Sequence, residues 1–273
     1  MQEGYWVTRT YEAGAVGEKI KFFVPGSRPD GKIRRRQRDE IRKAKQNQYS
    51  AVKAMARLIH ANFAAGDLVL GLDYSPEGLR KLLAWGKGQG LPVEDADDEI
   101  SLPAIRKAAE HELECALRRV KRLLEKEGKE LKAIYITSDM DGQTGETVRV
   151  HHHLIINREA REAFVACWEK RKKGSLGGVD WSPMSREQVD RTRLAEYMIR
   201  QVRHVKDEKK FRSTRNLVRP EPKDRIALTE AEVRVPKGCK LLFRQEYMPG
   251  QAQYIRYVIP GKLPKEGQEE ERA

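Results

Sequence analysis

The sequence predicts a fold that mixes β-strands with α-helices. Short segments whose side chains alternate in polarity, as in half-buried strands, are interspersed with longer segments whose apolar residues recur at helical spacing. Two strand-like segments, 132–138 and 148–157, flank the turn residues Asp141, Gly142 and Gly145. This arrangement is typical of a β-hairpin, so at least part of the predicted sheet is antiparallel.

The predicted elements follow in a clear order along the chain. Strands are expected within 5–24 (a hairpin), 68–74, 132–138, 148–157, 178–181 and 226–258. Helices are expected up to about residue 62 and over 76–88, 102–126 and 158–173. Ser185 and Gln188 form a capping-box pattern, which predicts a further helix from Ser185 to about Val205.

The composition favours a polyanionic partner and argues against a membrane protein. The 273 residues include 54 lysines and arginines and 41 acidic residues, a net charge of +13 at pH 7. This excess most simply indicates nucleic acid, although a basic protein without a polyanionic partner has the same composition. No apolar run approaches the roughly 20 residues that span a bilayer. Charges interrupt 1–23, which lacks the apolar centre of a signal peptide.

The three cysteines indicate neither a disulfide framework nor a zinc ribbon. Cys115, Cys167 and Cys239 are odd in number, widely separated and never paired as CxxC. We therefore expect a protein of the reducing cytoplasm. The chain also lacks a GxxxxGK[ST] segment, so a helicase motor of the P-loop type is not expected.

Three consecutive histidines occupy the predicted strand 148–157. Because alternate side chains of a strand point to opposite faces, His151 and His153 share the more polar face and His152 points to the apolar one. Two imidazoles side by side can hold one divalent metal ion. Half-exposed histidines with ordinary hydrogen-bond partners would show the same pattern, but the i, i+2 pair favours metal binding.

Two imidazoles need a further ligand, and Mg²⁺ or Mn²⁺ prefers an acidic or amide oxygen. Asp139 ends the neighbouring predicted strand, and the hairpin would bring it near His151. Asp141 and Asp73 are competing candidates, and each of the three could instead be an ordinary turn or strand-end residue. Asp139 is the first candidate among them.

The helix expected from Ser185 carries a tyrosine at the edge of its apolar stripe. The stripe consists of Leu194, Ala195, Met198, Ile199 and Val202. Tyr197 lies beside Arg193, Arg200 and Gln201, with His204 two turns on, so it borders a basic strip that could face a phosphate. Neighbouring cations and a metal-polarised phosphate would make attack by its phenol feasible. The simpler alternative is a boundary tyrosine with a packed ring and a hydrated hydroxyl.

Three ordered segments resemble the motifs of HUH-superfamily rolling-circle replication initiators. Residues 66–74, Gly-Asp-Leu-Val-Leu-Gly-Leu-Asp-Tyr, look like the FTLTY-type strand that follows a Gly-Asp. Residues 151–157 resemble the His-hydrophobic-His strand, and 195–200, Ala-Glu-Tyr-Met-Ile-Arg, resemble the Ala-x-Tyr-x-x-Lys helix. The polar segment 213–220 is similar to the one that follows this helix. The chain departs from the pattern at Gly71 and Asp73, where threonines are common, at His152, a usually hydrophobic position, and at Arg200, where lysine is usual.

The resemblance, which covers about 60–220, implies an α+β fold with a central antiparallel sheet and helices packed on one side of it. It implies an endonuclease that nicks and rejoins single-stranded DNA and leaves a 5′-phosphotyrosine link and a free 3′-OH. Carried over residue by residue, Tyr197 is the nucleophile, His151 and His153 are metal ligands with Asp139 as candidate third ligand, and Arg200 steadies the scissile phosphate. The metal would be Mg²⁺ or Mn²⁺.

The resemblance, together with the sequence patterns outside 60–220, divides the chain and sets its expected partners. The expected parts are an N-terminal hairpin and basic helix (1–60), an HUH endonuclease core (61–220), a β-rich extension (221–262) and a disordered charged tail (263–273). Partners would be single-stranded origin DNA of a phage, plasmid or integrated element and a separate or host helicase, without a membrane or a small-molecule cofactor. Residues expected to contact DNA are Arg34, Arg35, Arg36, Arg193, His204, Arg212 and Arg215.

Other functions fit the same residues. A relaxase or a transposase of this superfamily is a near alternative. A non-catalytic nucleic-acid-binding protein on a ferredoxin-like sheet would use aromatic and basic residues for stacking and phosphate contact. A metal-dependent phosphodiesterase would use water as the nucleophile and leave no protein on its product. A basic stretch such as 32–45 is most often only a solvated helix face.

Overall fold

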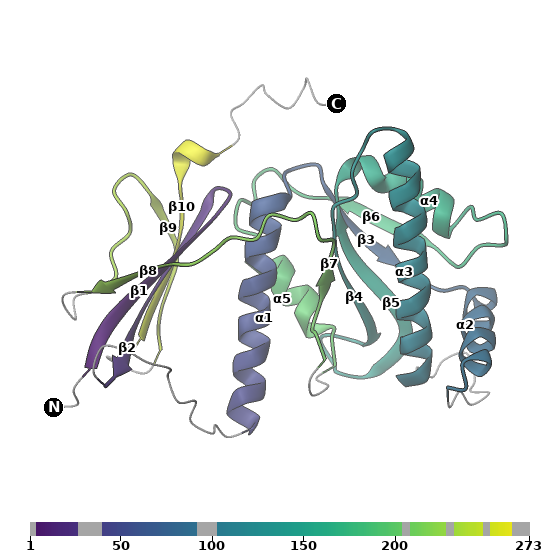
Figure 1. Ribbon diagram of the computed structural model, residues 1–273, viewed down its shortest axis with the longest axis horizontal. Coiled ribbons are helices and arrows are strands. Elements are labelled where there is room, and N and C mark those ends of the chain that lie inside the picture. Colours follow the sequence, from purple (N-terminus) through teal and green to yellow (C-terminus); the bar gives the residue numbers. More distant parts are fainter. Residues whose placement is uncertain are drawn as a thin grey trace.

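The computed structural model describes residues 4–26, 40–91, 103–203, 208–227, 232–247 and 252–263. Within these ranges the chain is a mixed α+β protein with two five-stranded antiparallel sheets and five α-helices (Figure 1). Arg34, Arg35, Arg36, His204 and the tail over 264–273 lie outside them. None of the helices described is both long and apolar enough to cross a membrane.

The first sheet, here called the terminal sheet, joins the two ends of the chain. Its strands run in the order β8-β1-β2-β10-β9. They are β1 (Gly4–Ala13), β2 (Val16–Pro25), β8 (Lys223–Ala227), β9 (Lys240–Tyr247) and β10 (Ala252–Val258). The N-terminal hairpin and the β-rich C-terminal region, each expected from its own pattern, therefore pair with one another.

The second sheet, here called the histidine sheet, carries all three consecutive histidines. Its strands run in the order β6-β3-β5-β4-β7, so β5 with the histidines is central. They are β3 (Leu68–Leu72), β4 (Ala133–Met140), β5 (Thr147–Ile156), β6 (Val179–Pro183) and β7 (Arg212–Ser213). The predicted hairpin of 132–157 is present as the antiparallel pair β4–β5.

Helices cover both faces of the histidine sheet, so the expected packing on one side only is wrong. One face is covered by α2 (Pro76–Gly88), α3 (Pro103–Lys126) and α4 (Arg161–Trp168). The other is covered by α1 (Glu40–Asn62) and α5 (Thr192–Arg200). Short 3₁₀ turns lie at Arg158–Ala160 and Pro260–Lys262.

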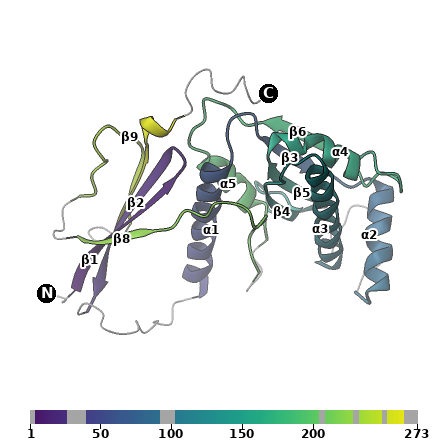
Figure 2. The ribbon, with the colours of Figure 1, turned by 45° about the horizontal axis from the view of Figure 1, so that its top comes forward.

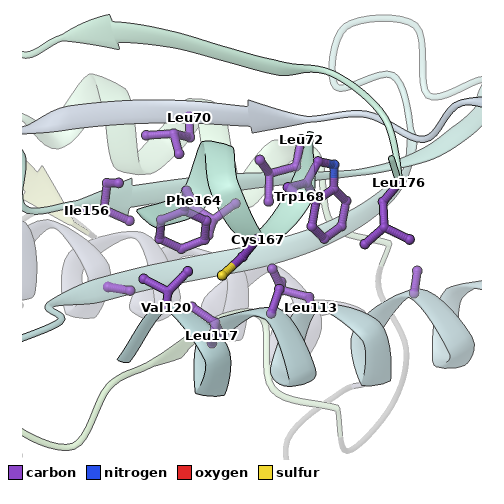
Figure 3. Close-up of a cluster of buried hydrophobic side chains, with 14 of the residues drawn as sticks. Leu70, Leu72, Leu113, Leu117, Val120, Ile156, Phe164, Cys167, Trp168 and Leu176 are labelled. Carbon is purple, nitrogen blue, oxygen red and sulfur yellow. The ribbon is translucent and has the colours of Figure 1, made fainter. Parts of the chain in front are cut away.

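Strand alternation explains why both faces are covered. Along β5, Leu154 and Ile156 enter the core under α3 and α4, whereas Ile155 enters the core under α1 and α5. All three are fully buried. Figure 3 shows the larger core, in which Phe164 and Trp168 of α4 fill the space between the strands and α3. A strand that is apolar on both faces at one end needs a helical layer on each side.

Helix α1 lies between the two sheets (Figure 1, Figure 2). Its apolar side packs with α5 on the histidine sheet. Arg57 on its other side binds the buried carboxylate of Glu18 on β2 at 2.7 Å. Gly14 closes the β1–β2 turn with φ of 54°, and a Cβ there would lie 2.2 Å from the carbonyl oxygen of His60. The terminal sheet is thus seated directly against α1.

The helix expected from Ser185 begins later than its capping-box pattern predicts. Helix α5 starts at Thr192 and ends at Arg200. The hydroxyl of Ser185 accepts a hydrogen bond from the backbone of Glu187 (3.2 Å), two residues on, rather than capping a helix. Instead the carboxylate of Asp190 accepts bonds from the backbone and hydroxyl of Thr192 (3.0 and 2.6 Å). Asp190 therefore supplies the acceptor at the start of α5.

Candidate active site on the histidine sheet

Two imidazoles converge on the face of β5 that α5 covers. The Nε2 atoms of His151 and His153 lie 3.1 Å apart, and their rings are nearly perpendicular at 4.9 Å. Nδ1 of His151 lies 2.9 Å from the carbonyl oxygen of Arg149, so an Nδ1–H donor there leaves Nε2 with its lone pair. Two ligands about 2.1 Å from one octahedral ion and at right angles to each other are about 3 Å apart. The donor set therefore fits one shared divalent ion.

The protonation states suit this arrangement. Burial, followed by the charge of His151, lowers the pKa of His153 to about 4. A neutral imidazole is the form that binds metals. At neutral pH, His153 is thus poised to donate a lone pair rather than to repel a cation.

His152 points the other way and is structural. Its Nε2 lies 2.8 Å from the hydroxyl of Tyr74, and its Nδ1 lies 2.9 Å from the hydroxyl of Thr137. The ring is fully buried against Trp168. Burial, followed by the charges of His151 and His153, lowers its pKa to about 3. The histidine that departs from the usual hydrophobic position is thus accommodated by two hydroxyl partners.

Replacing His152 by leucine is expected to destabilise the fold, because the half-buried hydroxyl of Thr137 loses its partner and the buried hydroxyl of Tyr74 keeps only a 3.4 Å bond to the carbonyl of Ala109. Each such loss costs about 1–3 kcal/mol, so the free energy of unfolding should fall by roughly 2–4 kcal/mol. His151→Leu is the matched control, since its ring is half-exposed and should change stability little in metal-free protein. Urea unfolding of both variants in EDTA measures the difference. Equal losses would contradict the structural role of His152.

The tyrosine of α5 lies beside the histidine pair. Ala195, Met198 and Ile199 are buried against α1 and the sheet, which leaves Tyr197 on the open side of the helix. Its ring centroid is 5.4 Å from that of His153, and its side chain is 48 % exposed. A packed helix and a central strand thus bring a phenol and two imidazoles together from residues more than forty positions apart.

An open pocket of about 320 Å³ borders this tyrosine. It is lined by Gly142, Gln143, Arg193, Glu196, Tyr197, Arg200 and Gln201. Gln201 closes one side, because its side-chain oxygen accepts a hydrogen bond from the backbone of Gly142 at 3.0 Å. The guanidinium groups of Arg193 and Arg200 are exposed one turn before and one turn after Tyr197. The pocket therefore offers one cation on each side of a phenol.

Two of the acidic candidates for a third metal ligand, Asp139 and Asp141, have their carboxylates engaged by other groups. The carboxylate of Asp139 is buried and binds Arg203 at 2.9 Å, so it does not join the histidine pair. That of Asp141 accepts backbone bonds from Gln143 and Thr144 within the β4–β5 turn. Across the described parts of the chain, no three His, Cys, Asp or Glu side chains form a group ready to hold a metal.

Asp73 is one of several acidic residues on the side of the histidine pair, together with Asp180 of β6, which pairs with Gly71. Gly71 pairs with His153 in the sheet, and Leu72 pairs with His152. Asp73 follows the last residue of β3, and continued alternation would return it to the face of Gly71. Its side chain is exposed. Thr137 pairs with His152, and the β4–β5 register shifts between Ser138 and Met140, so parity along β4 does not bring Asp139 to the histidine pair.

The other expected DNA contacts are dispersed. Arg212 on β7 binds Glu110 and Glu114 of α3, on the far side of the histidine sheet from α5. Arg215 is exposed in the segment that follows β7. Of the expected set, the structure brings Arg193 and Arg200 to the tyrosine. Arg203, which holds Asp139, was not singled out from the sequence.

Comparison with known proteins assigns no relative to this chain. No protein-family model, no curated protein and no solved structure matches it.

Proposed function

We propose that this protein is a metal-dependent endonuclease that nicks and rejoins single-stranded DNA, as an HUH-type initiator of rolling-circle replication does. The observation that carries the proposal is the ring of Tyr197, 5.4 Å from that of His153, beside two imidazoles whose Nε2 atoms converge. The excess of 13 positive charges supports a nucleic-acid substrate. A phage, plasmid or integrated element would supply the origin, and a separate helicase would unwind it in the cytoplasm.

The chemistry assigns a role to each side chain of the pocket. The hydroxyl oxygen of Tyr197 forms a bond to phosphorus, and the bond from phosphorus to the 3′ oxygen breaks. The products are a 5′-phosphotyrosine and a 3′-OH, which takes up a proton, and the reverse attack rejoins the strand. Arg193 and Arg200 bind the phosphate oxygens and oppose their developing charge. An Mg²⁺ or Mn²⁺ ion held by His151 and His153 would polarise the scissile phosphate.

One gel tests this proposal. Protein is incubated with 5′- or 3′-labelled single-stranded DNA and Mn²⁺, denatured and separated by electrophoresis. Label 3′ of the nick should migrate with the protein, because the phosphate stays on tyrosine, while label 5′ of it should appear on a shorter, protein-free strand. Cleavage without attached protein would indicate water as the nucleophile. Binding without cleavage on any strand would indicate a non-catalytic binding protein.

Of the three acidic residues considered from the sequence, we propose Asp73 as the third metal ligand, since Asp139 is engaged by Arg203 and Asp141 by its own turn. Asp73→Ala should weaken Mn²⁺ affinity at least tenfold, on the order of the loss seen when groups around a metal site are removed. Asp139→Asn is the matched control and should leave that affinity unchanged. Titration calorimetry of the DNA-free protein with MnCl₂ measures both. The reverse order of effects would assign the ligand to Asp139.

A further inference from the structure

The middle of strand β3 carries a glycine, Gly71, on the face of the histidine pair. Gly71 pairs with His153 of β5 on one side and with Asp180 of β6 on the other, so the three residues form one row across the sheet. Side chains of directly paired residues project to the same face of a sheet. His153 and Asp180 therefore flank a position at which the middle strand has no side chain, here called the glycine slot.

The fold itself gives no reason for a glycine at position 71. A Cβ added there would meet only the Cβ of Asp180, at an ordinary contact distance of 3.8 Å. The φ of Gly71 lies outside the left-handed region, and β3 pairs with both neighbours without a shift in register, so the glycine serves neither a turn nor a bulge. Gly17 of β2 is different, because a Cβ there would overlap the ring of Tyr257.

A glycine inside a strand has a cost, since it loses more conformational entropy on folding and offers no side chain to pack. Where packing does not require it, such a glycine often marks a place that a ligand approaches closely. Gly71 is half-exposed and lies beside His153, whose ring centroid is 5.4 Å from that of Tyr197. A nucleotide next to a phosphate at Tyr197 is therefore within reach of the peptide surface of Gly71.

The wall formed by Asp180 selects the part of a nucleotide that fits the slot. The side chain of Asp180 is exposed and makes no hydrogen bond or ion pair with any residue that the structure describes. A carboxylate repels phosphate oxygens, but it accepts a hydrogen bond from the N4 amino group of cytosine. Thymine carries an oxygen acceptor where cytosine carries this amino group. The wall thus favours a base over a phosphate, and cytosine over thymine.

The cations that suit the phosphate lie on the other side of the histidine strand. Arg193 and Arg200 line the pocket beside the turn that joins β4 to β5, whereas β3 and β6 lie on the side of β5 away from β4. A strand with its phosphate at the arginines can turn a base toward Gly71. A charged residue on an edge strand such as β6 often only prevents edge-to-edge association. That explanation accounts for Asp180 but not for the glycine beside it.

We propose that the glycine slot is a base-binding subsite that prefers cytosine to thymine next to the scissile phosphate, with Asp180 as the specificity-determining residue. The inference rests on the proposed DNA substrate and adds a base preference to it. The base lies on the peptide of Gly71, and its N4 amino group donates a hydrogen bond to the carboxylate of Asp180. The contact involves no covalent step and needs no metal ion.

Fluorescence anisotropy with short labelled oligodeoxycytidine and oligothymidine tests the subsite on the full-length protein. The buffer contains EDTA, so strands are bound without being nicked. The unmodified protein should bind oligodeoxycytidine at least about fivefold more tightly, roughly the discrimination that one base contact provides. Asp180→Asn should remove this preference, because an amide can donate to the thymine oxygen as well as accept from cytosine. Glu169→Gln removes the same charge at an exposed position just after α4, and this matched control should keep the preference.

A second variant, Gly71→Val, fills the slot from its floor. It should lower the affinity for oligodeoxycytidine to that for oligothymidine or below. The urea concentration at the midpoint of unfolding should not fall, because valine favours strands more than glycine does. A lower midpoint would show that the fold requires glycine at this position, and the argument for a ligand would be lost.

Three further results would overturn the proposal. The first is equal affinity of the unmodified protein for the two strands. The second is a preference that persists in Asp180→Asn, since its source would then be stacking rather than the carboxylate. The third is a loss of Mn²⁺ affinity in Asp180→Asn, measured by titration calorimetry of the DNA-free protein, since Asp180 would then be a metal ligand. Failure of the nicking proposal would appear instead as absence of the covalent adduct in the unmodified protein, whatever its base preference.

Discussion

Tyr197→Phe is expected to abolish the covalent protein–DNA adduct while DNA binding stays intact. The phenyl ring keeps the packing beside His153, but it lacks the oxygen that attacks phosphorus. Loss of a covalent nucleophile lowers rates by at least about 10³-fold. The hydroxyl makes no hydrogen bond to any residue that the structure describes, so its removal should leave stability and affinity nearly unchanged. Adduct yield and anisotropy on the same preparation measure the two effects.

The matched control is Tyr49→Phe. Tyr49 also lies on a helix, α1, and is 40 % exposed against 48 % for Tyr197. Its hydroxyl bonds to Gln245 of the terminal sheet, far from the histidine pair in the chain. This variant should form the adduct at the normal rate. Loss of adduct in both variants would point to damage of the fold, and persistence of adduct in Tyr197→Phe would assign the nucleophile to another residue.

Sequence reasoning succeeded where it depended on local periodicity. Alternation along β5 is enough to separate His151 and His153 from His152, because the period of a strand is two. The turn at Asp141 and Gly142 likewise predicts the β4–β5 pairing, since both strands are close in sequence. These features position the imidazole pair before any long-range contact is known.

Sequence reasoning failed where contacts between segments that are distant in the chain decide the structure. Nothing local shows that β2 pairs with β10, more than 200 residues away, or that Ile155 requires a helical layer on the polar side of its strand. The capping pattern at Ser185 was equally misleading. The segment up to Asp190 runs without helix to reach a cation on β10, and α5 begins only after that contact.

The second prediction with a large expected effect concerns the ion pair of Asp190 with Arg256, because three elements meet at Asp190. Its carboxylate accepts a 2.8 Å hydrogen bond from Arg256 of β10 and further hydrogen bonds from Thr192 at the start of α5. The next residue, Arg191, donates its backbone N–H to Nε2 of His60 on α1 at 2.8 Å. The helix that carries Tyr197 is therefore fixed at its N-terminus by both α1 and the terminal sheet.

Asp190→Ala should lower the free energy of unfolding by about 3 kcal/mol or more. It leaves the guanidinium of Arg256, only 13 % exposed, without its partner, and breaking a buried pair in this way costs about 3–5 kcal/mol. Loss of the hydrogen bonds from Thr192 adds about 1 kcal/mol. Asp224→Ala is the matched control: it breaks the Arg9–Asp224 pair, whose side chains are 37 % and 43 % exposed, and should cost under about 1 kcal/mol.

The pH dependence of this loss identifies its cause. Burial raises the pKa of Asp190, but the imidazole of His60, the bonds from Thr192 and the charge of Arg256 prevail and hold that pKa well below its usual range. A carboxyl whose pKa is lowered by folding contributes stability above its unfolded pKa of about 3.9 and loses it as the pH falls further. The difference in the free energy of unfolding between wild type and Asp190→Ala should therefore be constant above about pH 5 and become smaller below pH 4. If the difference in the free energy of unfolding persisted unchanged in acid, packing of Asp190 rather than its ion pair would anchor the helix that carries Tyr197.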